Sequence, residues 1–109
     1  MAREKFRTLT EQMFYVLLCL RTEYCGMDIM EQVKNTTNGR VTIGPGTLYN
    51  LLEQFQTAGM IRETKVEGRR RSYILTEKGS AALDAEYQRL CQQAQDYRCF
   101  FGKEDHDEG

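Results

Sequence analysis

The segment from residue 44 to residue 58 constrains the fold of this chain more than any other. Pro45 is the only proline among the 109 residues. A proline suits the first position of a helix, because its ring presets φ and its missing N–H would lack a partner there anyway. The apolar residues that follow are spaced i, i+3, i+4 and i+7, which predicts one buried face: Leu48, Leu51, Leu52 and Phe55. We therefore expect a helix that begins at Pro45, ends near Ala58, and carries Thr47 and Asn50 on its polar side.

Two further helices are predicted before this one. Thr10 and Glu11 precede an apolar run that ends at Leu20, which is typical of a capped and buried helix. Residues 24–26 are expected to break the chain. Residues 27–37 then place an apolar stripe opposite charged positions, as in an amphipathic helix, and Asn38 and Gly39 are suited to end it.

A two-stranded hairpin is expected after the third helix. Residues 61–66 and 69–75 read as strands joined by a turn at Gly68. Arg69, Arg70 and Arg71 are consecutive, so in an extended strand their side chains point to both faces and must stay solvated or find anions. Alone, this run is as consistent with a solvated loop as with phosphate binding. Beside a helix with a polar outer face we favour phosphate binding, although Arg71 could instead pair within the hairpin.

Three helices followed by a hairpin is the element order of a winged helix-turn-helix domain, in which the third helix enters the major groove of DNA. The predicted fold is therefore mainly α with a small β-hairpin. We divide the chain into a winged helix-turn-helix domain at residues 1–75, a C-terminal dimerisation helix at residues 76–102 and a flexible tail at residues 103–109.

Residues 9–83 also resemble the PadR family of transcriptional regulators. The motifs are Leu-Thr-Glu at 9–11, Gly-Pro-Gly-Thr-Leu-Tyr at 44–49, Ala-Gly-Met-Ile at 58–61, Gly-Arg-Arg at 68–70 and Tyr-Ile-Leu-Thr-Glu-Lys-Gly at 73–79. Where the family commonly has His-Gly-Tyr-Asp or Glu, this chain has Cys-Gly-Met-Asp at 25–28. The resemblance implies a homodimer whose C-terminal helix packs on the partner's first helix. It also implies a phosphate contact from the Tyr49 hydroxyl, with a partly buried Tyr49 as the alternative.

The C-terminal helix is predicted from Thr76 and Glu77, which can cap it, and from a heptad-like spacing of apolar residues. A helix of about 26 residues spans roughly 39 Å and outreaches a small winged domain. Its first turns can pack on the first helix of the same chain, and we expect the rest to pair in a twofold dimer. The seam consists of Leu83, Tyr87, Leu90, Ala94, Tyr97 and Phe101.

Bulky aromatic residues on that seam would leave irregular space between two subunits. Some short relatives bind flat aromatic compounds there, so the resemblance implies a possible pocket for a small aromatic effector lined by Tyr97, Phe100 and Phe101. A dimer core without a ligand is the alternative, and for aromatics at helical spacing it is the more common case.

The expected partner is a double-stranded DNA operator. A dimer would place two copies of the third helix in successive major grooves, about 34 Å apart, on a near-palindromic site. Thr47 and Asn50 are the candidates for base edges, and Arg69 and Arg70 for the backbone. The full set of expected DNA-contacting residues is Pro45, Thr47, Tyr49, Asn50, Arg69, Arg70 and Arg71. Repression would follow from blocking polymerase.

Composition argues against other classes of protein. The net charge of −1 combines +3 over residues 1–79 with −4 over residues 80–109, so positive charge lies where DNA would bind. The longest apolar run is eight residues, whereas a membrane span needs about twenty, and we expect a cytoplasmic protein.

Four cysteines without Cys-x-x-Cys spacing and a single histidine, His106, predict no metal site, no cofactor and no enzyme activity. Mostly buried, reduced thiols are expected, with a redox sensor as the alternative. The rival function is a winged-helix protein-interaction module that has lost DNA binding.

Overall fold

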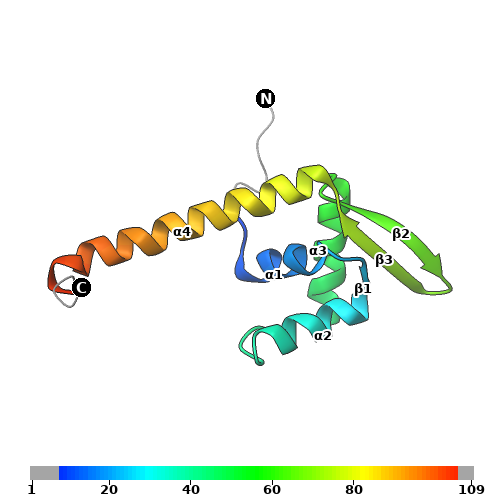
Figure 1. Ribbon diagram of the computed structural model, residues 1–109. Helices are drawn as coiled ribbons and strands as arrows, with labels where there is room; N and C mark the ends of the chain where they lie inside the picture. The colour runs from blue at the N-terminus through cyan, green and yellow to red at the C-terminus, as the bar shows by residue number, and fades with distance from the viewer. Residues whose placement is uncertain (1–7, 106–109) are drawn as a thin grey trace.

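A computed structural model describes residues 8–105 of the chain (Figure 1). These residues form four helices and a three-stranded antiparallel sheet. In chain order the elements are α1 (Glu11–Cys19), β1 (Tyr24–Cys25), α2 (Gly26–Thr36), α3 (Pro45–Thr57), β2 (Ile61–Glu67), β3 (Arg70–Leu75) and α4 (Glu77–Asp105). The winged helix-turn-helix order and the long C-terminal helix predicted from the sequence are both confirmed.

The ends of the first three helices follow local sequence signals. The Thr10 hydroxyl accepts a hydrogen bond from the backbone N–H of Met13 at 3.1 Å, which caps α1. Pro45 is the first residue of α3, as expected. After α2, Asn38 and Gly39 adopt φ angles of 56° and 78°. The left-handed backbone that Asn and Gly tolerate therefore turns the chain from α2 toward α3.

A buried threonine holds this turn in shape. The Thr37 hydroxyl donates to the carbonyl of Val33 at 2.8 Å and accepts from the backbone N–H of Val41 at 3.0 Å. Thr37 is itself buried, so these bonds satisfy polar groups that would otherwise be costly to bury. These hydrogen bonds hold the chain in its turn between α2 and α3.

The core lies among α1, α2, α3 and the base of the sheet. The four apolar positions predicted for α3 are all buried, and Leu48 and Phe55 are fully so. Side chains of this size contribute about 1.5–3 kcal/mol each when removed from water. The buried stripe orients α3 so that its opposite face looks outward.

The sheet has the strand order β1-β3-β2, so the hairpin is joined by a third strand. Tyr24 of β1 pairs with Tyr73 of β3, and Cys25 pairs with Ser72. The expected break between α1 and α2 and the expected hairpin are both present, but the sequence analysis missed that the break itself contains a strand. Two residues are too few to show an alternating pattern, and the strand exists because β3 offers it a free edge. Since α2 begins at the next residue, β1 ties the start of α2 to the hairpin.

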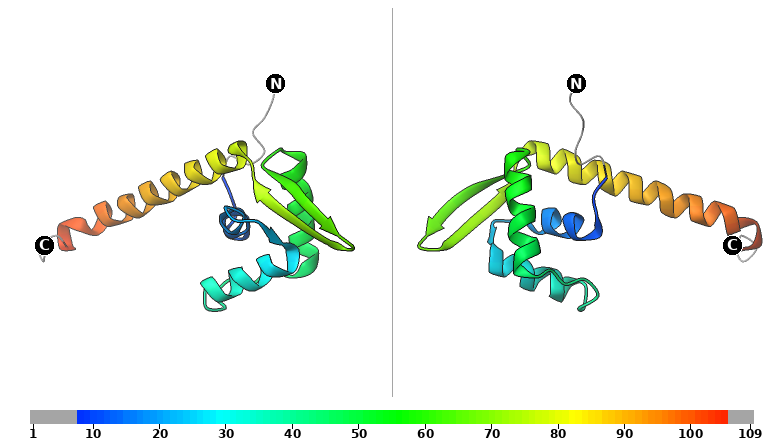
Figure 2. Two further views of the ribbon diagram at one scale, coloured as in Figure 1. Left: turned by 45° about the vertical axis from the view of Figure 1, so that its right-hand side comes forward. Right: turned by 180° about the vertical axis from the view of Figure 1, so that it is seen from behind.

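Helix α4 leaves the body of the molecule on the side opposite the hairpin (Figures 1 and 2). It runs to Asp105, three residues into the predicted tail, and the rest of that tail, with His106, lies outside the described residues. Leu83 is only 5% exposed and belongs to the core of its own chain. The first turns of α4 pack against α1, which was the alternative left open for this part of the seam. Within residues 8–105 no helix is long and apolar enough to span a membrane.

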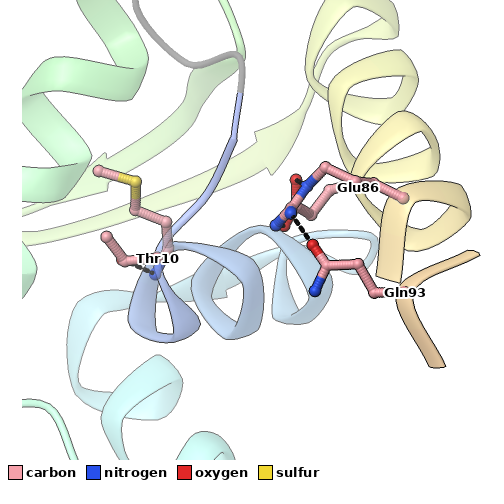
Figure 3. Close-up of polar contacts among 5 residues, drawn as sticks. Thr10, Glu86 and Gln93 are labelled. Atoms are coloured by element: carbon pink, nitrogen blue, oxygen red, sulfur yellow. Dashed lines mark hydrogen bonds and ion pairs between the residues drawn. The ribbon is translucent and has the colours of Figure 1, made fainter. Parts of the chain in front are cut away.

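A buried carboxylate stabilises the junction between α1 and α4. Glu86 is 3% exposed and accepts hydrogen bonds from the Arg89 guanidinium, one of them from Nε at 3.0 Å. Arg89 also donates to the side chain of Gln93 (Figure 3). The hydrogen bonds from Arg89 lower the pKa of Glu86, against the opposing effect of burial and with help from a bond to the Leu9 backbone. The sequence analysis missed Glu86, since nothing in its spacing marks a buried acid.

The cysteines do not form the mostly buried set that we expected. Cys25 is buried and Cys19 partly so, and burial raises the pKa of Cys19 to about 11. Cys91 and Cys99 are exposed, because the part of α4 that carries them extends beyond any core. Within the described part of the chain no three His, Cys, Asp or Glu side chains gather as a metal site would require.

Candidate nucleic-acid interface

The outward face of α3 carries the residues predicted to meet DNA. Pro45, Thr47 and Asn50 are exposed along its first turns, while Leu48 anchors the same turns in the core. Tyr49 is 50% exposed, so half of its side chain packs against the protein and half is accessible from outside. Short polar side chains at the start of a helix that stands clear of the body can reach the edges of bases.

The tip of the hairpin presents unpaired positive charge. Gly68 adopts a φ of 65° in the turn between β2 and β3. The arginines that follow it, Arg69 and Arg70, are exposed, and among residues 8–105 neither forms an ion pair. The Arg71 guanidinium instead donates to the Glu63 carboxylate at 2.9 Å. Arg71 thus takes the alternative foreseen for it, pairing within the hairpin, and two arginines remain free to bind an anion.

A pocket of about 460 Å³ lies between the hairpin and α3. It brings together four of the predicted residues, Tyr49 and Arg69 to Arg71, with four that the sequence analysis missed: Cys25, Gly26, Met27 and Tyr73. Pro45, Thr47 and Asn50 are not among its lining residues and lie on the open face of α3. The interface therefore has two parts, an exposed helix face and a basic pocket.

The close approach of Tyr49 to the start of α2 shapes this pocket. A Cβ atom at Gly26 would lie 2.7 Å from the Tyr49 hydroxyl oxygen and 3.0 Å from its ring. No side chain larger than hydrogen fits there without moving the tyrosine. The motif at residues 25–28 was the only signal that could have pointed to Gly26, and it does not reveal which residue packs on it.

The floor of the pocket includes a buried phenol. Tyr73 is buried, and desolvation raises its pKa. The Glu63 carboxylate and the Tyr49 hydroxyl raise the pKa further, whereas the Arg71 guanidinium opposes them. The Tyr73 hydroxyl therefore stays protonated and neutral, and the positive charge of the arginines at the rim is not offset by this group.

A second exposed surface runs along α4. Beyond Leu83 the predicted seam faces solvent, and the Tyr97 and Phe101 rings contact each other at a centroid distance of 4.9 Å. Phe100 is 84% exposed and lies beside the seam. The exposed members of this surface, which we call the α4 seam, are Tyr87, Leu90, Ala94, Tyr97 and Phe101.

Residues 16–85 match the family model described as the transcriptional regulator PadR-like family. The match begins within α1 and covers α2, α3, the sheet and the start of α4, and so includes the elements that build the interface. The chain belongs to the PadR-like family of transcriptional regulators. It is a DNA-binding regulator, and proteins of this class are generally not enzymes.

Solved structures share the fold of this PadR-like chain. A PadR family regulator from Eggerthella lenta DSM 2243 is 22% identical with a TM-score of 0.64, over 79% of this chain and 80% of its own. A transcriptional regulator from Clostridium thermocellum is 19% identical with a TM-score of 0.63, over 85% and 90%. PcaV from Streptomyces coelicolor, solved with its natural ligand, is 17% identical with a TM-score of 0.67, over 84% and 62%. No curated protein sequence matches significantly.

The departure of this PadR-like chain from the common family motif has a structural role. Cys25, which stands at the position of the usual histidine, immediately precedes α2, and its thiol donates to the Asp28 carboxylate at 3.3 Å. Met27, at the position of the usual tyrosine, lines the basic pocket with a side chain that is 64% exposed. The substitution leaves the fold intact and changes the chemistry of one pocket wall.

Proposed function

We propose that this PadR-like regulator is a repressor that binds a near-palindromic operator as a homodimer. The observation that carries the proposal is the position of Arg69 and Arg70, which form no ion pair within residues 8–105, beside the exposed face of α3. In a winged helix-turn-helix complex such a helix lies in the major groove and the hairpin meets the flanking backbone.

Each residue of the interface has a proposed role. Thr47 and Asn50 reach base edges in the major groove, where their hydroxyl and amide groups can discriminate bases. Arg69 and Arg70 neutralise backbone phosphates, which gives affinity without sequence information. Tyr49, whose side chain is half exposed, donates its hydroxyl to a phosphate, and Pro45 sets the first turn of α3 against the backbone. Arg71 acts indirectly, by bracing the hairpin through Glu63.

Dimerisation through the α4 seam supplies the second DNA-recognition helix, which is α3 of the other protomer. An apolar strip left in water costs about 25 cal/mol per Å², so a protruding helix with this pattern favours a partner. Beside the start of α4 lies a hollow of about 550 Å³ whose lining includes Phe14, Leu18, Leu83 and Tyr87. The distal aromatics of a second copy of α4 have the size and chemistry to fill that hollow. Twofold pairing would then place two α3 helices on successive major grooves.

The regulatory part of the proposal is repression by exclusion of polymerase from the operator. An aromatic effector bound at Tyr97, Phe100 and Phe101 would alter the distance between the two α3 helices of the dimer. Support for this part comes from the exposure of these three rings on α4, and a dimer core without a ligand remains the competing arrangement.

The test is a fluorescence-anisotropy titration of DNA fragments that the purified protein selects from genomic DNA, repeated over a range of salt concentrations. The double variant Arg69→Ala/Arg70→Ala should bind all sequences more weakly. The slope of log K against log salt should fall by about 0.9 for each phosphate that the variant no longer neutralises. Arg62→Ala is the matched control, because Arg62 is exposed at the other end of the same hairpin.

Two outcomes would contradict the proposal. If wild type shows no binding at low salt, the chain is better explained as an interaction module that has lost DNA binding. If Arg62→Ala and the double variant give the same salt slope per charge removed, the hairpin tip has no special place at the backbone.

A further inference from the structure

The link between α2 and α3, residues 38–44, has one buried side and one exposed side. Val41 and Ile43 are buried in the core, whereas Arg40, Thr42 and Gly44 are exposed. Alternate residues of an extended segment face opposite sides, so the three exposed positions form one outward row. We call the row of Arg40, Thr42 and Gly44 the link edge.

Contacts from other elements hold the link in place. The Thr37 hydroxyl bonds to both the backbone N–H and the carbonyl of Val41. The Gln12 side chain of α1 donates to the Thr42 carbonyl at 3.1 Å. A partner that binds the link edge would therefore meet a surface already in its final shape and would lose little affinity to ordering it.

The link edge carries a positive charge that is only loosely paired. The Arg40 guanidinium lies 3.8 Å from the Glu11 carboxylate, and the two side chains are 63% and 64% exposed. Exposed pairs of this kind contribute little to stability, so Arg40 can exchange Glu11 for another anion. Beside Arg40 lies an open hollow of about 530 Å³, lined by residues 36–40, none of which is acidic.

The other two positions of the link edge suit a close contact with a chain of phosphates. Thr42 offers an exposed hydroxyl donor. No atom of the described residues lies within 4 Å of the place where a Cβ of Gly44 would be, and its φ of −80° is open to any residue. The bare backbone at Gly44 thus serves no packing need within the described part of the chain and leaves room for another molecule.

The link and the hairpin lie on opposite sides of α3 (Figures 1 and 2). A helix with its side chains is about 10–12 Å across, and the major groove of DNA is about 12 Å wide. A helix in that groove therefore has one DNA strand on each side. When the hairpin meets one strand, the link faces the other.

We propose that the link edge is a second contact for the DNA backbone, on the strand across the major groove from the hairpin. The Arg40 guanidinium neutralises a phosphate of that strand, and the Thr42 hydroxyl donates to the same strand beside the open position at Gly44. With a backbone contact on each side, α3 is fixed in position across the groove. This inference rests on the proposed function, because it takes α3 to lie in the major groove.

Phosphate-ethylation interference on the selected DNA fragment tests the position of the contact. In full-length wild type, ethylation should block binding at phosphates of both strands beside each α3. For Arg40→Ala the interference should weaken at phosphates of one strand only. For Arg69→Ala/Arg70→Ala it should weaken at phosphates of the other strand.

Anisotropy titrations over a range of salt concentrations test the chemistry of the contact. Arg40→Ala should raise the Kd for DNA about tenfold and lower the slope of log K against log salt by about 0.9 for each phosphate lost. Arg40→Lys keeps the charge and should keep the slope of wild type. Thr42→Val removes a neutral donor, so it should raise the Kd about threefold without changing the slope. Arg62→Ala, at the base of the hairpin, is the matched control for removing an exposed arginine elsewhere.

The outcomes distinguish this inference from the proposed function. If wild type binds DNA and Arg40→Ala changes affinity and slope no more than Arg62→Ala, the link is not a contact and the proposed function stands. Weakened interference at the same phosphates for Arg40→Ala and for the hairpin variant would also overturn the inference, because both contacts would then lie on one strand. If wild type does not bind DNA at low salt, the proposed function fails and the link contact fails with it.

Discussion

Replacing Glu86 with Gln tests the buried junction between α1 and α4. The change keeps the size of the side chain and removes the charge that Arg89 binds. A hydrogen bond to a charged group contributes about 1.5–3 kcal/mol. Because the Arg89 side chain is 37% exposed and solvent screens the pair, we expect a loss of about 1–2 kcal/mol in the free energy of unfolding.

The pH dependence gives a second and sharper signature. Folding lowers the pKa of Glu86, with Arg89 as the main cause, so the folded state holds the proton less tightly than the unfolded state. The stabilisation is therefore fully present above the ordinary pKa of about 4.5. It is lost as the pH falls through the lowered value of the folded protein.

The assay is urea unfolding at fixed protein concentration, at pH 7 and again at about pH 3. Asp84→Asn is the control, since Asp84 is an exposed acid on the same helix. The reasoning would be refuted if the two variants lose the same stability at pH 7. It would also be refuted if the difference between wild type and Glu86→Gln were as large at pH 3 as at pH 7.

Three further predictions concern glycines and the α4 seam. Gly79→Ala should destabilise the protein by about 3 kcal/mol or more in urea unfolding, because the new Cβ would lie 2.0 Å from the backbone oxygen of Met60; near-wild-type stability would contradict this. Gly26→Ala should fold but bind DNA about tenfold more weakly in anisotropy titrations, because the Tyr49 ring can move aside at the expense of its phosphate contact; unchanged affinity would remove Tyr49 from the interface. Tyr97→Lys should shift sedimentation from dimer to monomer, because a charge on the exposed seam would be buried by pairing, and an unchanged dimer would place the contact elsewhere.

The sequence was sufficient wherever a structural decision is made by neighbouring residues. Pro45 begins α3, Thr10 caps α1, and Asn38 with Gly39 ends α2, each through backbone geometry within one or two turns. The spacing of apolar residues identified the buried face of α3 and hence its exposed one. The PadR-like family was also recognisable from short motifs, since these encode the same local turns.

Contacts between distant segments were not predictable in this way. The edge of β3 decides whether Tyr24 and Cys25 form a strand, and the packing of α1 decides that Leu83 joins the core of its own chain. The four cysteines look alike in the sequence. Only the departure of α4 from the body leaves Cys91 and Cys99 exposed.

The sequence by itself determined the four helices and the two strands of the hairpin, which side of α3 is polar and where positive charge gathers. Tertiary structure alone decided that Arg71 is held by Glu63, while Arg69 and Arg70 form no ion pair with the described residues, and that Gly26 meets Tyr49 to form a pocket wall. The physical reason is the separation along the chain over which each kind of interaction acts. Capping and periodicity act over a few residues, whereas a pocket or an ion pair depends on where the whole fold brings two distant segments.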